Sequence, residues 1–305
     1  MAGGEARAQP PVVRDEQRAR PVVQEGRQLW FGTATDIDDE RRTALRLQRA
    51  LLPSALDAPP GVEVAARYLP ATDLLEVGGD WYEVFAVPGG QIGIAVGDVV
   101  GHNLEAAAAM GQLRAGMLAL ATQGGHPGDL LAGLDAFAHA HAITDYATAG
   151  CAFLDPQRGE LRFATAGHPP MLVVAPDGVV TWLEGARTRP LGSLWGIVPA
   201  VEAHQLEPGS VVVAYSDGLV ERRGRSITDG LERLAEHVVR HRTTPVDELC
   251  ARVVGEMTGE SPSDDDVVLL CLRWLGPPTV AEPPDRARVA QLSSDRGLVG
   301  GPAAP

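Results

Sequence analysis

Four aspartates stand at the ends of apolar runs in this sequence, each beside a glycine or another aspartate. They are Asp80 in EVGGDWYEVF, Asp98 in IAVGDVVGH, Asp217 in VVVAYSDGLVE and Asp265 in SPSDDDVVLL. A single Asp in such a place is usually a turn residue, but four are harder to explain because a carboxylate is costly to bury. If the fold brings these ends together, the carboxylates repel one another unless cations neutralise them. Two divalent ions balance four carboxylates, and a set of oxygen ligands favours magnesium or manganese over zinc.

The elements that must position these aspartates follow from the apolar patterning. In chain order we expect strands at 61–70, 75–88 and 91–100, helices at 104–122 and 127–143, a strand-rich run at 148–217, helices at 228–241 and 245–257, and a strand at 266–275. Asn103 is expected to cap the first of these helices. Short hairpin connections predict antiparallel sheets. The predicted fold class is therefore α+β, as a four-layer α-β-β-α sandwich of two antiparallel sheets flanked by helix pairs.

The chain divides into a folded region between two polar ends. Residues 1–35 and 276–305 are rich in Pro, Gly and Arg, so we expect disordered tails. Residues 36–53 are expected to form a linker helix, and residues 54–275 a single domain. A thin apolar stripe along 36–52 favours a weak homodimer through this segment; it consists of Ile37, Ala44, Leu45, Leu51 and Leu52.

Composition excludes several classes of protein. The formal charge of −14 argues against a nucleic-acid partner, which needs a basic face. No run approaches the ~18 apolar residues of a membrane span, and the polar start lacks the apolar region of a signal peptide. The three cysteines are scattered, which predicts reduced structural thiols. We therefore expect a cytoplasmic protein with no membrane partner.

Five motifs, in this order and spacing, resemble the PPM-type (protein phosphatase 2C-like) Ser/Thr phosphatases, and within them the bacterial SpoIIE/RsbU branch. They are VGGDWYEVF, GDVVGHNLEAA, TAGHPP, YSDGLVE and DDVVLL. The upstream LQRALLP resembles the lead-in segment of that branch, so the resemblance extends over about residues 41–275.

The resemblance implies a two-metal centre between the sheets, holding two divalent cations, manganese or magnesium. Hydrolysis would proceed by attack of a metal-activated water on phosphorus, without a phosphoenzyme. The implied ligands are Asp98 for both ions, Asp80 and the backbone carbonyl of Val99 for one ion, and Asp217 and Asp265 for the other.

Some positions leave alternatives open or depart from the family pattern. Asp264 and Asp266 flank the last ligand, and we choose Asp265 as the first residue of the DDVV pair. His102 has two interpretations, a turn residue or the general acid for the leaving oxygen. The departures are Val100, where a small polar residue is commoner, Val268 in place of Thr, and Asn103 in place of Gly, which we expect to keep a left-handed turn.

Other residues are expected to support the site without reacting. His168 in TAGHPP is interpreted as a hairpin residue. Four glycines beside the aspartates are expected to permit special backbone conformations and close metal approach; they are Gly78, Gly79, Gly97 and Gly218.

The implied function is that of a metal-dependent phosphoserine/phosphothreonine protein phosphatase in a bacterial signalling circuit that regulates a sigma factor. The implied partner is a phosphorylated protein substrate, an anti-sigma factor antagonist. One rival is a catalytically degenerate phosphatase-fold protein that binds a phosphoprotein as a regulator. Another is a small-molecule phosphohydrolase with the same metal chemistry, although the sequence has no nucleotide-binding Gly-rich loop to support it.

Overall fold

A computed structural model describes most of the region between the polar ends. The described residues are 18–24, 27–33, 50–53, 55–71, 78–101, 103–144, 146–193, 198–222, 224, 226–259 and 265–278. None of the helices in this part of the chain has the length and apolar character that a membrane span requires.

Two β-sheets form the centre of the molecule. The first has the strand order β10-β7-β6-β5-β4, with β11 also paired to β7; its strands are β4 (Asp80–Val87), β5 (Gln91–Val99), β6 (Ala147–Asp155), β7 (Glu160–Ala166), β10 (Arg187–Thr188) and β11 (Glu202–Gln205). The second has the order β3-β13-β12-β8-β9, with β3 (Val62–Leu69), β8 (Met171–Val174), β9 (Val180–Leu183), β12 (Val211–Tyr215) and β13 (Val267–Trp274). Every pairing in these sheets is antiparallel except that of β10 with β7.

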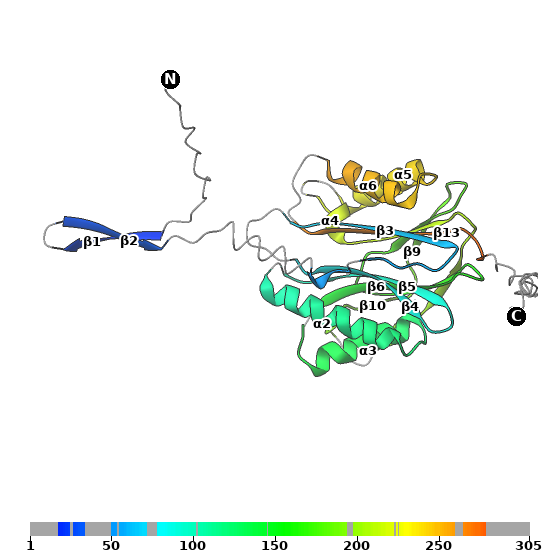
Figure 1. Cartoon of the computed structure of the whole chain (residues 1–305), viewed down its shortest axis with the longest axis horizontal. Coiled ribbons are helices and arrows are strands. Elements are labelled where there is room, and N and C mark those ends of the chain that lie inside the picture. The colour runs from blue at the N-terminus through cyan, green and yellow to red at the C-terminus, as the bar shows by residue number, and fades with distance from the viewer. Residues whose placement is uncertain are drawn as a thin grey trace, which may run out of the picture.

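Helix pairs cover the two outer faces. The pair α2 (Leu104–Ala121) and α3 (Pro127–Ala140) packs on the first sheet, and the pair α5 (Ile227–His241) and α6 (Val246–Thr258) packs on the second (Figure 1). A short helix, α4 (Asp217–Val220), directly follows β12. The predicted four-layer sandwich is therefore confirmed, and the short elements α4 and β10 within it were not predicted.

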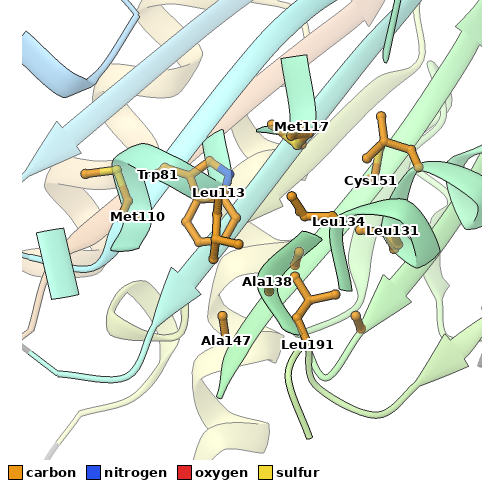
Figure 2. Packing of buried hydrophobic residues seen from close by; sticks show 14 of the residues in the cluster. Trp81, Met110, Leu113, Met117, Leu131, Leu134, Ala138, Ala147, Cys151 and Leu191 are labelled. Carbon is orange, nitrogen blue, oxygen red and sulfur yellow. The ribbon is translucent and has the colours of Figure 1, made fainter. Parts of the chain in front are cut away.

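Three apolar layers hold these elements together. One lies between the first sheet and its helices, where Trp81, Met110 and Leu134 are fully buried (Figure 2). A second fills the space between the sheets, and a third lies under α5 and α6. The buried β5 and β13 take part in two layers each, because alternate side chains on a strand point to opposite faces. This packing fixes the strand ends at which the aspartates lie.

The amino-terminal region contains more regular structure than the predicted disordered tail. Strands β1 (Arg18–Gln24) and β2 (Arg27–Thr33) pair with each other as an antiparallel two-stranded sheet. The prediction rested on the Pro, Gly and Arg content of residues 1–35. It underrated PVV and LWF, which are β-branched and aromatic segments with a high strand propensity.

Most of the helix predicted at 36–52 lies outside the described residues, as do residues 279–305 of the predicted carboxy-terminal tail. The two leucines at the end of its apolar stripe are described. Leu52 is buried in the layer under α2, and Leu51 packs against the same layer. These two side chains therefore contact their own domain.

Candidate metal centre

Asp80 and Asp98 are direct neighbours across the first sheet. Asp80 begins β4, Asp98 is the penultimate residue of β5, and the two are paired in the antiparallel register. The Asp80 side chain is buried, and its Oδ2 atom has no hydrogen-bond partner. The pairing thus places two carboxylates together at an end of the hairpin, where like charges repel.

Asp217 and Asp265 lie at the matching edge of the second sheet. Asp217 lies two residues after the end of β12, and Asp265 lies two residues before the start of β13. These strands are antiparallel neighbours, with Tyr215 opposite Leu269. The end of one strand therefore meets the start of the next. Asp98 and Asp217 line one cleft, and the charges of Asp217 and Asp265 both act on Asp98, so the four predicted aspartates lie near one another across the two sheets.

Burial and mutual repulsion shift the pKa values of these carboxyl groups. Burial, then the charges of Asp217 and Asp265, raises the pKa of Asp98 to about 7. Burial, then the Asp98 charge, raises the pKa of Asp80 well above its usual range, although hydrogen bonding with Ser216 opposes the shift. Burial, then Asp265, also raises the pKa of Asp217. In each case the charged form lacks compensating positive charge.

Asp266 differs from its neighbour Asp265 in what its carboxylate contacts. It is buried, and it accepts hydrogen bonds from the Tyr68 hydroxyl on β3 and, at 2.8 Å, from the backbone N–H of Ala71. Both of its oxygens thus tie β3 and the segment after it to the start of β13. Asp265 is exposed. The Asp265 Oδ1 accepts a hydrogen bond from the Asp266 N–H at 2.8 Å, and the Asp266 charge also acts on Asp80. Asp265 stays the predicted ligand of the DDD run, and Asp264 lies outside the described residues.

Two glycines allow the backbone to close around the cluster. A Cβ on Gly79 would lie 2.1 Å from the carbonyl oxygen of Val99, and one on Gly218 would lie 2.1 Å from that of Asp266. Neither glycine has a positive φ. The expectation of special backbone conformations is therefore wrong for these two positions, and close approach is the reason that a side chain does not fit.

The residues present fit divalent cations, judged by their chemistry and their burial. The donors are carboxylate oxygens and a backbone carbonyl, which suit magnesium or manganese. The unpaired Asp80 Oδ2 and the raised pKa values indicate negative charge that a cation would neutralise. Within the described residues no three His, Cys, Asp or Glu side chains form a closed metal-binding group. The carboxylates therefore form a neighbouring set and not a preformed cage.

His168 joins the two sheets beside this cluster. It is buried, its Nδ1 lies 2.9 Å from the Thr148 hydroxyl on β6, and its Nε2 lies 3.0 Å from the carbonyl oxygen of Tyr215 on β12. Burial lowers the pKa of His168 to about 4. The hairpin interpretation of this residue was incomplete, because its ring is a neutral cross-link between the layers.

The departures from the family pattern have separate structural outcomes. Asn103 is the N-cap of α2, and its Oδ1 accepts a hydrogen bond from the Ala106 N–H at 2.9 Å. Its backbone is extended, with φ −129°, so the predicted left-handed turn is wrong and the predicted cap is confirmed. Val268 is buried between the sheets, and Val100 is exposed. His102 lies outside the described residues.

A cleft of about 340 Å³ opens beside Asp98 and Asp217. Thr148 and His168 also line it, together with residues from the β9–β10 region and α5. The sequence analysis did not predict this cleft or the contributions of Tyr68 and Ser216. Tyr68 sits within an ordinary strand pattern, so no local signal marks it. Ser216 directly precedes Asp217, and this adjacency was the available clue.

Solved structures share this fold and define the class of the protein. The RsbU and RsbW domains of Rv1364c from Mycobacterium tuberculosis match with a TM-score of 0.69 and 32% identity, over 80% of this chain and 70% of that one. The PP2C phosphatase domain of the cell fate determinant SpoIIE from Bacillus subtilis matches with a TM-score of 0.61 and 17% identity, over 70% and 63%. The fold is that of the PP2C-type phosphatases.

The chain belongs to the SpoIIE family, described as Stage II sporulation protein E, whose sequence profile matches residues 88–275. Phosphoserine phosphatase RsbU from Bacillus subtilis (strain 168) is 27% identical over 202 residues, which are 64% of this chain and 58% of that protein. The chain spans about half the length of the curated relatives it matches. The resemblance to the SpoIIE/RsbU branch is thereby confirmed.

Proposed function

We propose that this chain is a metal-dependent phosphoserine/phosphothreonine protein phosphatase. The observation that carries the proposal is the meeting of Asp80, Asp98, Asp217 and Asp265 from two sheets at one edge of the sandwich. Membership of a family of PP2C-type phosphatases, and the name phosphoserine phosphatase borne by RsbU, support the same chemistry.

In this proposal the carboxylates would hold two divalent cations. Asp98 would serve both ions, because charges from the second sheet act on it and Asp80 is its partner on the first. Asp80 and the Val99 carbonyl would serve one ion, and Asp217 and Asp265 would serve the other. The bound cations would supply an activated water and would neutralise charge on the phosphoryl group.

The protein's own residues orient these ligands and control protons. The Val268 N–H donates to the Ser216 hydroxyl at 2.9 Å, which ties the end of β12 to β13, and the Tyr68–Asp266 contact fixes the start of β13. His168 does not donate a proton to the leaving oxygen, because it is neutral and both ring nitrogens lie within hydrogen-bond distance of protein oxygens. For His102 the two interpretations, a turn residue or the general acid, both stay predictions.

We extend the proposal to the biological partner. The substrate is a phosphorylated protein in a sigma-factor regulatory circuit, of the kind called an anti-sigma factor antagonist. Support for this step comes from the similarity to RsbU and from the RsbU and RsbW domains that share the fold.

Phosphate release from matched peptides tests the activity. One sequence would be supplied with phosphoserine, phosphothreonine or phosphotyrosine, and rates measured with manganese and with chelator. We expect release from the first two peptides only when manganese is present. Binding of a phosphopeptide without any release would favour the degenerate regulator, and equal rates with chelator would contradict the metal requirement.

A further inference from the structure

The cleft beside the carboxylate cluster is larger than a phosphoryl group requires. Its volume of about 340 Å³ lies in the range of ~300–1,000 Å³ that is usual for pockets holding a drug-sized ligand. Asp98 and Asp217 occupy part of the lining, and the rest comes from residues outside the proposed metal centre. The cleft therefore has room for more of the substrate than its phosphate.

Among the described residues that line the cleft, Arg187 is the single arginine or lysine, and His168 is neutral. Arg187 is exposed, and its guanidinium makes no ion pair or hydrogen bond with any residue that the structure describes. Its backbone is fixed, because it pairs with Thr165 of β7 and the flanking Thr165 N–H donates to the Ala186 carbonyl at 3.0 Å. The sheet thus fixes the point from which the exposed Arg187 side chain extends beside the cleft.

Apart from the polar Thr148 and His168, the other lining residues are apolar or acidic. Ile227 and Leu231 lie one turn apart on α5, and Ile227 is 45% exposed. Glu221 lies at the end of the cleft that adjoins the proposed metal centre, because its charge acts on Asp217. Glu184 lies three residues before Arg187, in the connection between β9 and β10. An apolar wall next to a cation that has no partner within the described part of the chain suits a peptide that carries an acidic side chain.

We propose that this cleft binds the extended segment of the substrate that flanks the phosphorylated residue, and that Arg187 pairs with an acidic side chain in that segment. The inference rests on the proposed phosphatase function and adds a specificity-determining residue to it. We assign recognition of the charged substrate side chain to Arg187 and not to Glu184, because Arg187 lies on a strand that is paired into the sheet.

The sheet register gives the distance between the two ends of this subsite. Asp98 pairs with Thr148, Gly150 pairs with Thr165, and Thr165 pairs with Arg187, so three strand spacings and two residues separate the ends. At ~4.8 Å per spacing and ~3.3 Å per residue, the Cα atoms lie about 15 Å apart. The side chains of Asp98 and Arg187 both extend into the cleft, so the distance that the substrate backbone must cover is shorter than this. The acidic residue of the substrate therefore lies about two to four positions from the phosphorylated residue.

A positional peptide set tests the subsite. Alanine-based phosphoserine peptides would carry one Glu, or one matched Gln, at each position up to four residues on either side. With manganese, the wild type should favour Glu over Gln by about fivefold in kcat/KM at one such position, the size of an exposed ion pair. The preference should weaken at high salt, since salt screens exposed charges.

Substitutions identify the residue that reads the charge. Arg187→Ala should bring the Glu-to-Gln ratio to about one, Arg187→Glu should favour a Lys peptide instead, and Arg187→Lys should keep part of the ratio. Glu184→Ala, the matched control on the same rim, should keep or raise it. A ratio unchanged in Arg187→Ala, or a wild type with hydrolysis but no favoured position, would overturn the subsite alone. Absence of hydrolysis of every peptide and of p-nitrophenyl phosphate would overturn the proposed function, and the subsite with it.

Discussion

At the scale of single residues, Asp98 has the most demanding position in the cluster. It pairs with Asp80 across the hairpin, and the negative charges of Asp217 and Asp265 at the edge of the other sheet raise its pKa. Asp98→Ala should leave the fold intact and reduce hydrolysis of p-nitrophenyl phosphate to less than about a tenth of the wild-type rate, or ~1.4 kcal/mol in the barrier. Asp247→Asn, which removes an exposed carboxylate, is the matched control. Retention of most activity by Asp98→Ala with excess manganese would show that the ligand assignment is wrong.

Tyr68 also acts at this scale, through its hydrogen bond to the buried Asp266 carboxylate. Tyr68→Phe leaves that charge with one donor fewer, which should lower the free energy of unfolding by about 1.5–3 kcal/mol in urea titrations with chelator present. The exposed Tyr146 provides the control Tyr146→Phe, for which we expect no comparable loss. Equal stabilities of the two variants would mean that the Tyr68 hydroxyl does not support the start of β13.

At the scale of elements, His168 connects the sheets through Thr148 on β6 and Tyr215 on β12. Its pKa is about 4 in the fold, against ~6.5 in the unfolded chain. Between these values the unfolded state binds more protons, so stability falls as the pH falls. The stability advantage of the wild type over His168→Gln should shrink by about 2 kcal/mol between pH 7.5 and pH 5. The carboxylates are common to both proteins, so a constant difference would contradict a neutral buried ring.

The order and class of the long elements could be predicted from the sequence. The Ala and Leu content and the Asn103 cap mark α2, and continuous apolar runs mark β5 and β13, because strands buried on both faces are apolar at nearly every position. Short pieces could not be found this way. The two residues of β10 and the four of α4 are too few to show a period, and their conformation depends on neighbours such as β7.

The aspartates of the site could also be predicted from the sequence, because a carboxylate at the end of an apolar run is unusual. The contacts that support them were not visible. Tyr68 and Asp266 are 198 positions apart, and His168 and Tyr215 are 47 apart, so only the packing of the layers brings them together. Arg187 carried no signal either, because its importance comes from the cleft that it lines.

At the scale of the whole molecule, metal binding should couple the two sheets. The clustered carboxylates come from both of them, so removal of cations would leave their repulsion uncompensated. A cation at 100 times its dissociation constant adds ~2.7 kcal/mol to the stability of the folded state, which corresponds to ~5–10 °C for a domain of this size. Thermal melts with manganese and with chelator measure this difference, and identical melting temperatures would count against a clustered site.

The most direct test of the central claim is a calorimetric manganese titration of the metal-free wild type and of Asp98→Asn. This conservative change keeps the side-chain shape but removes the Asp98 charge, which interacts with Asp80 on its own sheet and with Asp217 and Asp265 at the other. We predict about two manganese ions per wild-type chain, in keeping with four carboxylates, and loss of at least one of them in Asp98→Asn. Binding of manganese to the variant with the stoichiometry and affinity of the wild type would contradict the account.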